Sequence, residues 1–147
     1  MAALTNTIEI DRPPEEVFGY ASDPLRFPEW QADVLEVHFV DPEAKEVGSL
    51  FTTTRRTGPN ERTMTQEITE VVVPHRFAVH GVDGLIRPHA SMDVEPLDAG
   101  TRSRVTFALD FEGHGLGKAL IPAVRQLAVR AAPVSHRRLK ARLEARG

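Results

Sequence analysis

The chain has 147 residues, the size of one ordinary domain, so we expect a single domain over residues 1–147. Its 41% hydrophobic and 27% charged residues are typical of a globular protein, and the absence of cysteine excludes disulfides, thiolate nucleophiles and cysteine-ligated zinc. The net charge of −3 is unevenly distributed: residues 1–113 carry 10 Lys+Arg and 20 Asp+Glu, whereas residues 114–147 carry 8 basic residues and one acidic residue, Glu144.

The first residues of the chain lack the charged start and apolar stretch of a signal peptide, and no run of 18 apolar residues occurs, so we expect a cytoplasmic protein without a membrane span.

The N-terminal region begins with a predicted strand. Apolar and polar residues alternate over residues 4–10, the period of a half-buried strand. Asp11 can cap a following helix, and two prolines suit its first turn. Short helical segments are therefore expected over residues 15–21 and 24–30.

The middle of the chain is predicted to be a series of strands. From Val34 onward the alternation has the period of a strand, and turn signals separate the apolar runs. Six consecutive strands joined by tight turns favour an antiparallel meander that is apolar on one face. The expected strands lie at residues 34–39, 50–56, 63–73, around 77–79, 86–95 and 105–112.

A long helix is predicted after the glycine-rich residues 113–117. The apolar period changes there to 3.6, with an apolar stripe at Leu120, Val124, Leu127, Ala131 and Val134. The basic residues lie mostly off this stripe. One interpretation is that these basic residues bind nucleic acid, an anionic membrane or a partner. The other is that they form the solvated face of a helix that docks on the acidic remainder of the protein. Because no aromatic residues are interleaved with them, we favour the second interpretation and expect no nucleic acid partner.

This order of elements predicts an α+β fold with a curved seven-stranded antiparallel sheet, two short helices and one long C-terminal helix. Only the long helix is large enough to cover the apolar face of the sheet. A strongly twisted sheet curls, and one helix cannot fill its concavity, which favours an apolar cavity between the two. The alternative is a fully packed core without a void.

Several segments resemble the START-like (birch-pollen-allergen-like) superfamily, and in particular its bacterial polyketide cyclase/dehydrase-like branch. The resemblance spans nearly the whole chain in the right order. It rests on residues 8–11, 13–18, 22–24, 27–30, 47–49, 74–77, 100–102 and 139–144, which read IEID, PPEEVF, SDP, FPEW, VGS, PHRF, GTR and LKARLE. The resemblance implies a helix-grip fold over an apolar cavity, but it identifies no substrate, because the superfamily includes lipid carriers, hormone receptors and aromatase/cyclases.

The expected cavity wall follows from the apolar strand faces and the helix stripe. Gln66 shares a face with Met64 and Ile68, so it is the best-supported internal polar group. The face that Phe51, Thr53 and Arg55 share remains open, and Trp30 matches the superfamily's tryptophan near the cavity mouth. Arg55 and Arg138 are candidates to bind an acidic head group. The candidate ligand-binding residues are Trp30, Phe51, Thr53, Arg55, Met64, Gln66, Ile68, Phe77, Val79, Pro88, Ala90, Met92, Phe107, Leu109, Leu120, Val124 and Leu127.

No sequence motif for catalysis or cofactor binding is present, so catalytic residues remain unassigned and no cofactor is expected. His75 and His80 should point to opposite faces of a strand, and no His-x-x-x-His pair occurs on the helix, so we expect no metal site. His89 shares a strand face with Arg87 and Asp93, and this face should point to solvent.

The sequence thus favours binding of a hydrophobic small molecule, either a lipid or a polyketide-like compound. The inferred wall is rich in aliphatic residues, and the chain has one Trp and one Tyr, which suits an aliphatic or mixed ligand better than a polycyclic one. A polyketide cyclase, dehydratase or aromatase acting in the same cavity is one alternative. A regulatory or interaction protein that uses the basic helix is another. The apolar faces are used internally, which slightly favours a monomer over a dimer.

Overall fold

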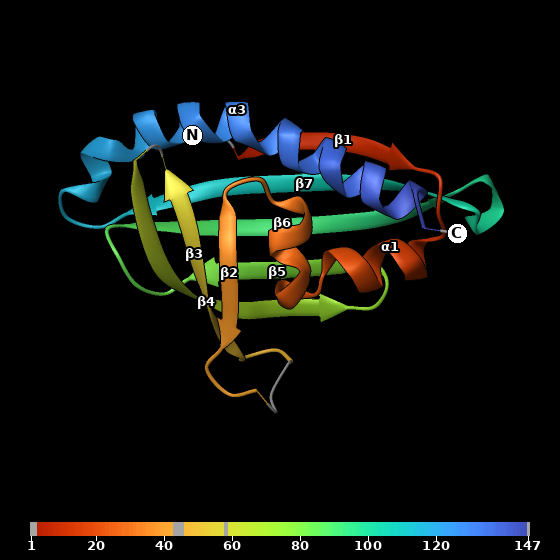
Figure 1. Ribbon diagram of the computed structural model, residues 1–147, viewed down its shortest axis with the longest axis horizontal. Coiled ribbons are helices and arrows are strands. Elements are labelled where there is room, and N and C mark those ends of the chain that lie inside the picture. The colour runs from red at the N-terminus through yellow and green to blue at the C-terminus, as the bar shows by residue number, and fades with distance from the viewer. Residues whose placement is uncertain (1–2, 43–45, 58, 147) are drawn as a thin grey trace.

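The computed structural model describes residues 3–42, 46–57 and 59–146. Seven strands form one antiparallel sheet in the order β1-β7-β6-β5-β4-β3-β2, so β1 and β2 lie at opposite edges of the sheet although they are neighbours in the chain (Figure 1). The strands are β1 (Leu4–Ile10), β2 (Val34–Phe39), β3 (Leu50–Thr57), β4 (Asn60–Val72), β5 (Arg76–Gly81), β6 (Ile86–Leu97) and β7 (Arg102–Gly113).

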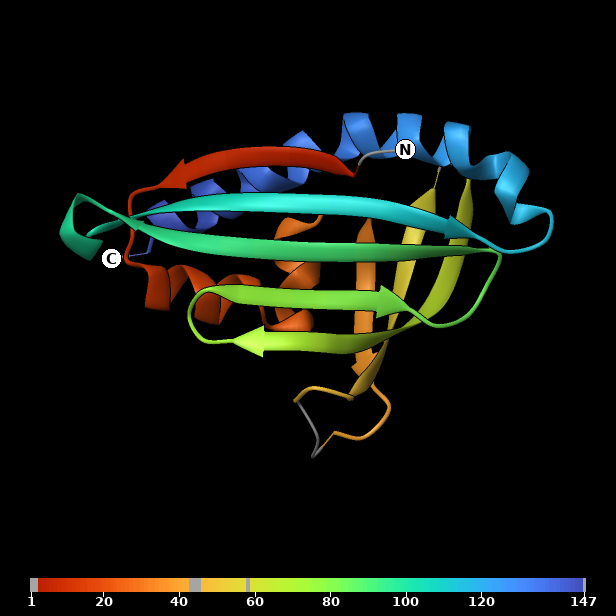
Figure 2. The ribbon, with the colours of Figure 1, turned by 180° about the vertical axis from the view of Figure 1, so that it is seen from behind.

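Helices flank one side of this sheet. They are α1 (Pro14–Ala21), the 3-10 turn η1 (Pro24–Arg26), α2 (Phe27–Trp30) and the long α3 (Gly117–Glu144), with a second 3-10 turn, η2 (Asp98–Gly100), between β6 and β7. The sheet is strongly bent, because β2 and β3 run steeply across the direction of β5, β6 and β7 (Figures 1 and 2). α3 packs along β1 and β7 and also contacts α2. This arrangement confirms the predicted α+β helix-grip fold.

Two strands begin earlier in the chain than predicted, because their first residues are polar. β4 begins at Asn60 and β7 at Arg102, whereas the alternation of apolar residues placed their starts at residues 63 and 105. Backbone pairing continues there without apolar side chains: Thr57 is paired with Asn60, and Leu97 with Arg102. Alternation detects only the part of a strand that has a buried face, so it misses these ends.

One end of the molecule is fully packed. Inward-facing side chains of the sheet and the C-terminal half of α3 meet there and exclude solvent. Leu139 and Leu143 of α3 have no exposed surface. The buried side chains at this end come from the sheet, from α1 and from α3. They are Ile10, Val17, Phe18, Val94, Val105, Leu139 and Leu143.

The buried face of α3 differs from the predicted stripe in the N-terminal half of the helix. Leu120 is 43% exposed and Leu127 is 51% exposed, so both lie off the face that meets the sheet. Counting back from the buried Leu139 in steps of four and three gives the less exposed positions, which are Ser135, Ala131, Ala128, Val124 and Ile121. The face of α3 that lies over the middle of the sheet is therefore made largely of small side chains.

The C-terminal end of α3 is tied to the turn that follows β1. The backbone N–H of Asp11 donates to Glu144 Oε2 at 2.9 Å, and Arg12 donates to the carbonyl of Glu144 at 2.8 Å. Lys140 Nζ donates to the carbonyl of Glu9 at 2.6 Å. We call this group of hydrogen bonds the terminal clamp; it holds α3 in register against β1. Within the described part of the chain, no helix has the length and apolar character needed to cross a membrane.

Candidate functional site

A buried polar pair lies on the inner face of the sheet. Thr53 of β3 has no exposed surface, and its hydroxyl donates to Gln66 Oε1 of β4 at 3.2 Å. The burial of Thr53 and its neighbour Phe51 resolves the open question of parity, because it shows that Phe51, Thr53 and Arg55 face inward. The Gln66 side chain is likewise buried, at the position expected from its strand face.

Arg55 continues this inner row, but its charge already has partners. Its guanidinium donates to Asp33 Oδ1 and to Gln31 Oε1, each at 3.0 Å. Both partners belong to the connection between α2 and β2. Arg55 therefore holds this connection against β3, and a bound anion would have to compete with Asp33 for it.

An aromatic group lies between α2, β7 and α3. The ring of His136 on α3 stacks on Phe107 of β7, with centroids 3.8 Å apart, and Trp30 of α2 lies 6.1 Å from the same Phe107. Trp30 Nε1 is buried and has no hydrogen-bond partner among the described residues. An indole N–H without a partner is uncommon in a protein interior and offers a donor to a ligand.

His136 has an unusual electrostatic environment within this group. Asn6 of β1 donates its side-chain N–H to His136 Nδ1, and the imidazole is almost completely buried. Burial lowers the pKa of His136 from 6.5 to about 4, because the charged form would lose its hydration. The imidazole is therefore neutral at pH 7. His136 is not among the candidate residues that the sequence pattern predicts, although its place four residues after Ala132 and three before Leu139 puts it near the buried face.

The apolar candidates fall into three groups by their exposure. The buried candidates are Trp30, Phe51, Ile68, Phe77, Val79 and Met92. The half-buried candidates lie toward the N-terminal half of α3, in contrast to the closed end of the core; they are Met64, Pro88, Ala90, Phe107, Leu109 and Val124. Leu120 and Leu127 are exposed.

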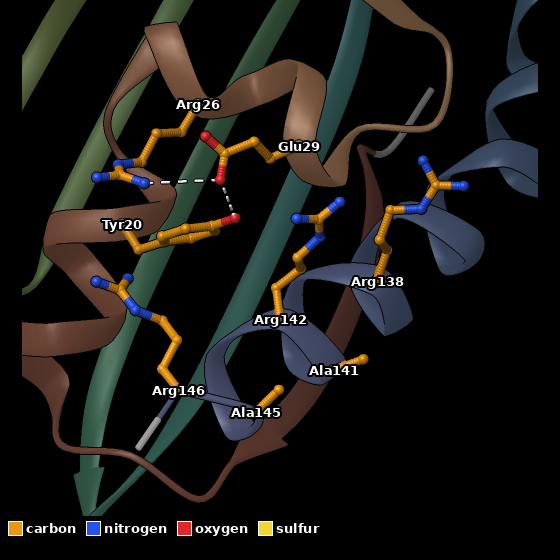
Figure 3. Close-up of a pocket in the computed structure, with 8 residues that line it drawn as sticks. All are labelled: Tyr20, Arg26, Glu29, Arg138, Ala141, Arg142, Ala145 and Arg146. Atoms are coloured by element: carbon orange, nitrogen blue, oxygen red, sulfur yellow. Dashed lines mark hydrogen bonds and ion pairs between the residues drawn. The ribbon is translucent and has the colours of Figure 1, made fainter.

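A surface pocket of about 500 Å³ lies where the C-terminal half of α3 faces α1 and α2 (Figure 3). Tyr20 lines this pocket and donates its hydroxyl to Glu29 Oε1 at 2.8 Å, while the guanidiniums of Arg26 and Arg146 each lie 5.2 Å from the centre of the Tyr20 ring. Burial and the hydrogen bond to Glu29 raise the pKa of Tyr20. Arg138 lines this pocket, so it belongs to a different region of the molecule from Arg55.

A second pocket, of about 360 Å³, lies between α1 and the ends of β4 and β5. Its lining is mainly apolar and includes Phe39, Ile68, Val71 and Phe77. Two of the candidate residues, Ile68 and Phe77, therefore contribute to a pocket beside α1, and none of its lining residues belongs to α3. The sequence did not indicate it, because it depends on how α1 lies against the sheet.

The comparison with protein families identifies the chain. The family described as "Polyketide cyclase / dehydrase and lipid transport" matches over residues 1–144. The chain belongs to this family. A search of the curated proteins found no match.

Solved structures show the fold of this polyketide cyclase/dehydrase family member in other proteins. The Zhui aromatase/cyclase from Streptomyces sp. R1128 superimposes with a TM-score of 0.81 at 13% identity, covering 98% of this chain and 94% of that one. A START superfamily protein from Mycobacterium smegmatis gives a TM-score of 0.79 at 13% identity, with 98% of each chain covered. The di-domain ARO/CYC BexL gives 0.76 at 15% identity. This chain covers only 47% of BexL, although 98% of this chain is matched. The START-like fold is thus established.

Proposed function

We propose that the chain, acting as a single domain over residues 1–147, binds one hydrophobic small molecule between the inner face of the sheet and α3. The observation that carries this proposal is that small side chains of α3 leave the apolar side chains of the sheet beneath them only half-buried. The middle of α3 presents small residues such as Ala128 and Ala131, while Ala90, Phe107 and Leu109 opposite them are only half-buried. Protein interiors are normally close-packed, so apolar surface left half-covered inside a fold is a place where an apolar ligand gains from burial.

The chemistry of this surface favours an aliphatic or mixed ligand. Methionine side chains, such as Met64 and Met92, adapt to ligand shape. The polar groups near this surface are few: the buried Thr53–Gln66 pair, the indole N–H of Trp30 and the imidazole of His136. Such a lining orients one polar end of a molecule while the rest is held by dispersion and the hydrophobic effect.

Binding can be tested with the fluorescent apolar anion 1-anilinonaphthalene-8-sulfonate. We expect one saturable site in the unaltered chain. Ala90→Trp places a large side chain on the half-buried surface that faces α3 and should weaken dye binding at least about tenfold, since the dye loses much of its apolar burial there. Val71→Trp, in the second pocket, is the matched control and should leave dye affinity unchanged. If Val71→Trp weakens the dye while Ala90→Trp does not, the ligand site is the second pocket and the proposal is wrong.

The natural ligand can be sought by native mass spectrometry of the purified chain, followed by denaturation and identification of what is released. We expect a stoichiometric lipid or polyketide-like molecule. Its loss from Ala90→Trp, with the thermal unfolding midpoint preserved, would tie the passenger to the inner face of the sheet. A passenger retained in Ala90→Trp would contradict that location.

A polyketide cyclase or dehydratase activity is the second candidate function. It is favoured by the neutral, buried imidazole of His136 stacked on Phe107, because a neutral imidazole in an apolar site can exchange protons with a reacting group. The structural similarity to an aromatase/cyclase is consistent with this. Incubation with a synthetic poly-β-keto thioester should then give a cyclised product faster than the spontaneous reaction, and His136→Phe should abolish the difference. Equal rates with and without protein would leave ligand binding as the function.

A further inference from the structure

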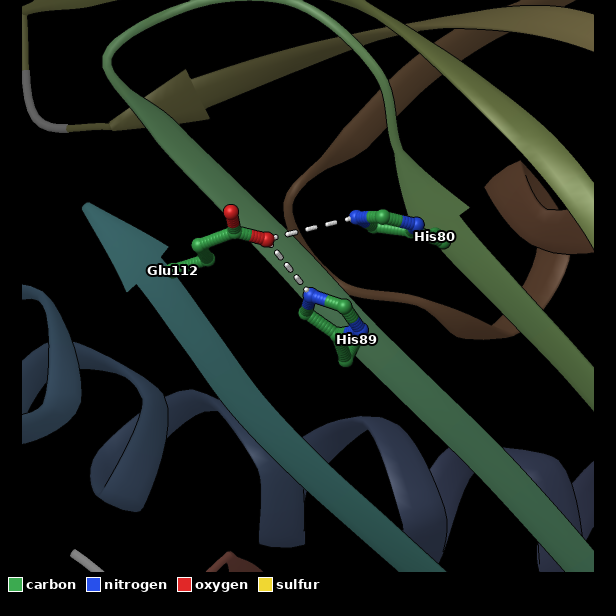
Figure 4. A group of neighbouring side chains, drawn as sticks. All are labelled: His80, His89 and Glu112. Atoms are coloured by element: carbon green, nitrogen blue, oxygen red, sulfur yellow. Dashed lines mark hydrogen bonds and ion pairs between the residues drawn. The ribbon is translucent and has the colours of Figure 1, made fainter. Parts of the chain in front are cut away.

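Three side chains of types that can ligate a metal ion meet on the outer face of the sheet, away from the proposed ligand site (Figure 4). His80 on β5 and His89 on β6 are directly paired across the strands. Glu112 lies on β7, which is the other neighbour of β6. All three point to the same side, because each lies at an outward position of the strand alternation. We call these residues the His80–His89–Glu112 cluster.

The distances within this cluster are short. His89 Nε2 lies 3.0 Å from Glu112 Oε2, and His80 Nε2 lies 3.6 Å from the same oxygen. The two imidazole rings are stacked with centroids 3.8 Å apart, and the three ligand atoms all lie within 4.8 Å of one another. Two donor atoms that each lie about 2.0 Å from a tetrahedral ion are about 3.3 Å apart. The cluster is therefore close to the spacing that an ion requires before any side chain moves.

His80 adds an independent observation. Its Nε2 is buried and makes no hydrogen bond among the described residues, and 3.6 Å to Glu112 is too long for one. A buried ring nitrogen without a partner is costly in a folded protein. An ion held beside Glu112 would satisfy it.

His114 lies on the other side of the Glu112 carboxylate. His114 Nε2 is 2.9 Å from Glu112 Oε1, at ion-pair distance but without the geometry of a hydrogen bond, and Glu112 Oε2 is the oxygen nearest His80 and His89. Arg87, opposite Glu112 on β6, donates instead to the carbonyl of Gly84, so its side chain is engaged by the loop between β5 and β6. In known metal sites, ligating carboxylates commonly have a polar neighbour behind them, the position that His114 occupies here.

We propose that His80, His89 and Glu112 bind a divalent transition-metal ion, with Zn²⁺ as the closest chemical fit. Two imidazole nitrogens and one carboxylate oxygen are a donor set that Zn²⁺ accepts, and water would complete the coordination. Mg²⁺ and Ca²⁺ fit poorly because they require mostly oxygen ligands.

The position of the site indicates what the ion would do to the molecule. It would link β5, β6 and β7, and through His114 it would also reach the start of α3. The backbone N–H of His114 donates to the carbonyl of Leu85 at 2.8 Å, and Gly117 packs so closely on Leu85 that a Cβ would clash with it. The bound ion would thus stabilise the junction where the loop between β5 and β6 meets α3.

The test uses the untagged full chain and Zn²⁺ as the probe, measured by isothermal titration calorimetry in a non-chelating buffer at pH 7.5. We expect one ion per chain with a dissociation constant in the micromolar range or tighter. His89→Ala and Glu112→Gln should each weaken binding at least about tenfold. Zn²⁺ should also raise the thermal unfolding midpoint of the unaltered chain more than that of either variant, since only a bound ion shifts the unfolding equilibrium.

The matched control is His38→Ala, which removes an exposed imidazole on β2, far along the sheet order from β6. It should bind Zn²⁺ like the unaltered chain. Unfolding in urea without metal confirms that each variant folds. The proposal is overturned if the unaltered chain shows no saturable binding, or if His89→Ala and Glu112→Gln bind as tightly as His38→Ala.

Discussion

At the scale of single residues, His136 shows how the interior of this protein determines charge. Its ring is stacked on Phe107 and accepts a hydrogen bond from Asn6, so the folded protein holds it neutral well below the pH at which a solvated histidine becomes charged. The unfolded chain has no such constraint, and it takes up a proton as the pH falls below about 6.5. Because His136 has a lower pKa in the folded protein than in the unfolded chain, the free energy of unfolding depends on pH.

We predict that this histidine makes the protein less stable in mild acid. Its pKa is lower in the folded state, so its contribution is constant above about pH 6.5 and stability falls as the pH drops toward 4, where the folded form also protonates. Between pH 7 and pH 5 the loss from this group is about 2 kcal/mol. Urea unfolding at the two pH values measures it, and His136→Phe should lose less stability over the same interval. An identical loss in His136→Phe would show that other groups are responsible.

At the scale of secondary-structure elements, the two halves of α3 have different roles. The C-terminal half is part of the core, whereas Leu127 and its neighbours in the N-terminal half are largely exposed. Leu139→Ala should therefore lower the free energy of unfolding by about 2–5 kcal/mol, the cost of a cavity in a packed core. Leu127→Ala, the same chemical change on the same helix, should alter it by no more than about 0.5 kcal/mol. Equal losses in urea unfolding would contradict this division.

The elements themselves could largely be predicted from the sequence, because alternation with a period of two and a stripe with a period near 3.6 are local signals. The phase of α3 could be predicted only in part. The predicted stripe was right at Val124 and Ala131, but a small residue such as Ala128 is compatible with either face of a helix. The predicted stripe followed the larger Leu120 and Leu127, which the structure leaves exposed. Counting back from Leu139 would have given the right phase.

The candidate site was predictable to a smaller extent. Gln66 was placed correctly on the inner face from its neighbours on β4, but the face of Thr53 had to come from the structure. The partners of Arg55 lie in the connection after α2, and no local pattern connects them. Likewise, the meeting of His80 with His89 depends on strand register, which a one-residue shift or a β-bulge changes.

At the scale of the whole molecule, the terminal clamp joins the first strand to the last helix. The hydrogen bond from the Asp11 backbone, with further support from Lys140, lowers the pKa of Glu144. Glu144→Ala removes a charged hydrogen-bond acceptor and should reduce stability by about 1–2 kcal/mol at pH 7. Glu61→Ala, which removes an exposed ion pair with Arg56, should reduce it by less than about 1 kcal/mol.

The effect of Glu144→Ala should also depend on pH. Because the folded-state pKa of Glu144 is lowered, its stabilisation is fully present above the unfolded value and disappears as the pH falls through the folded one. The stability difference between the unaltered chain and Glu144→Ala should therefore shrink in acid. Thermal unfolding at pH 7 and at pH 3.5 measures this, and a difference that grows in acid would show that the clamp acts through another group.

The pairing of β1 with β7 sets the order in which this protein can fold on the ribosome. Leu4 is paired with Leu109, so β1 emerges first and must wait while roughly 100 further residues are added, which takes roughly 5–20 seconds. During that time, strands β2 to β6 can pair with one another in sequence, but β1 remains an unpaired segment. Its outward side chains are Thr5, Thr7 and Glu9, a polar and charged face of the kind that discourages pairing with a neighbouring nascent chain.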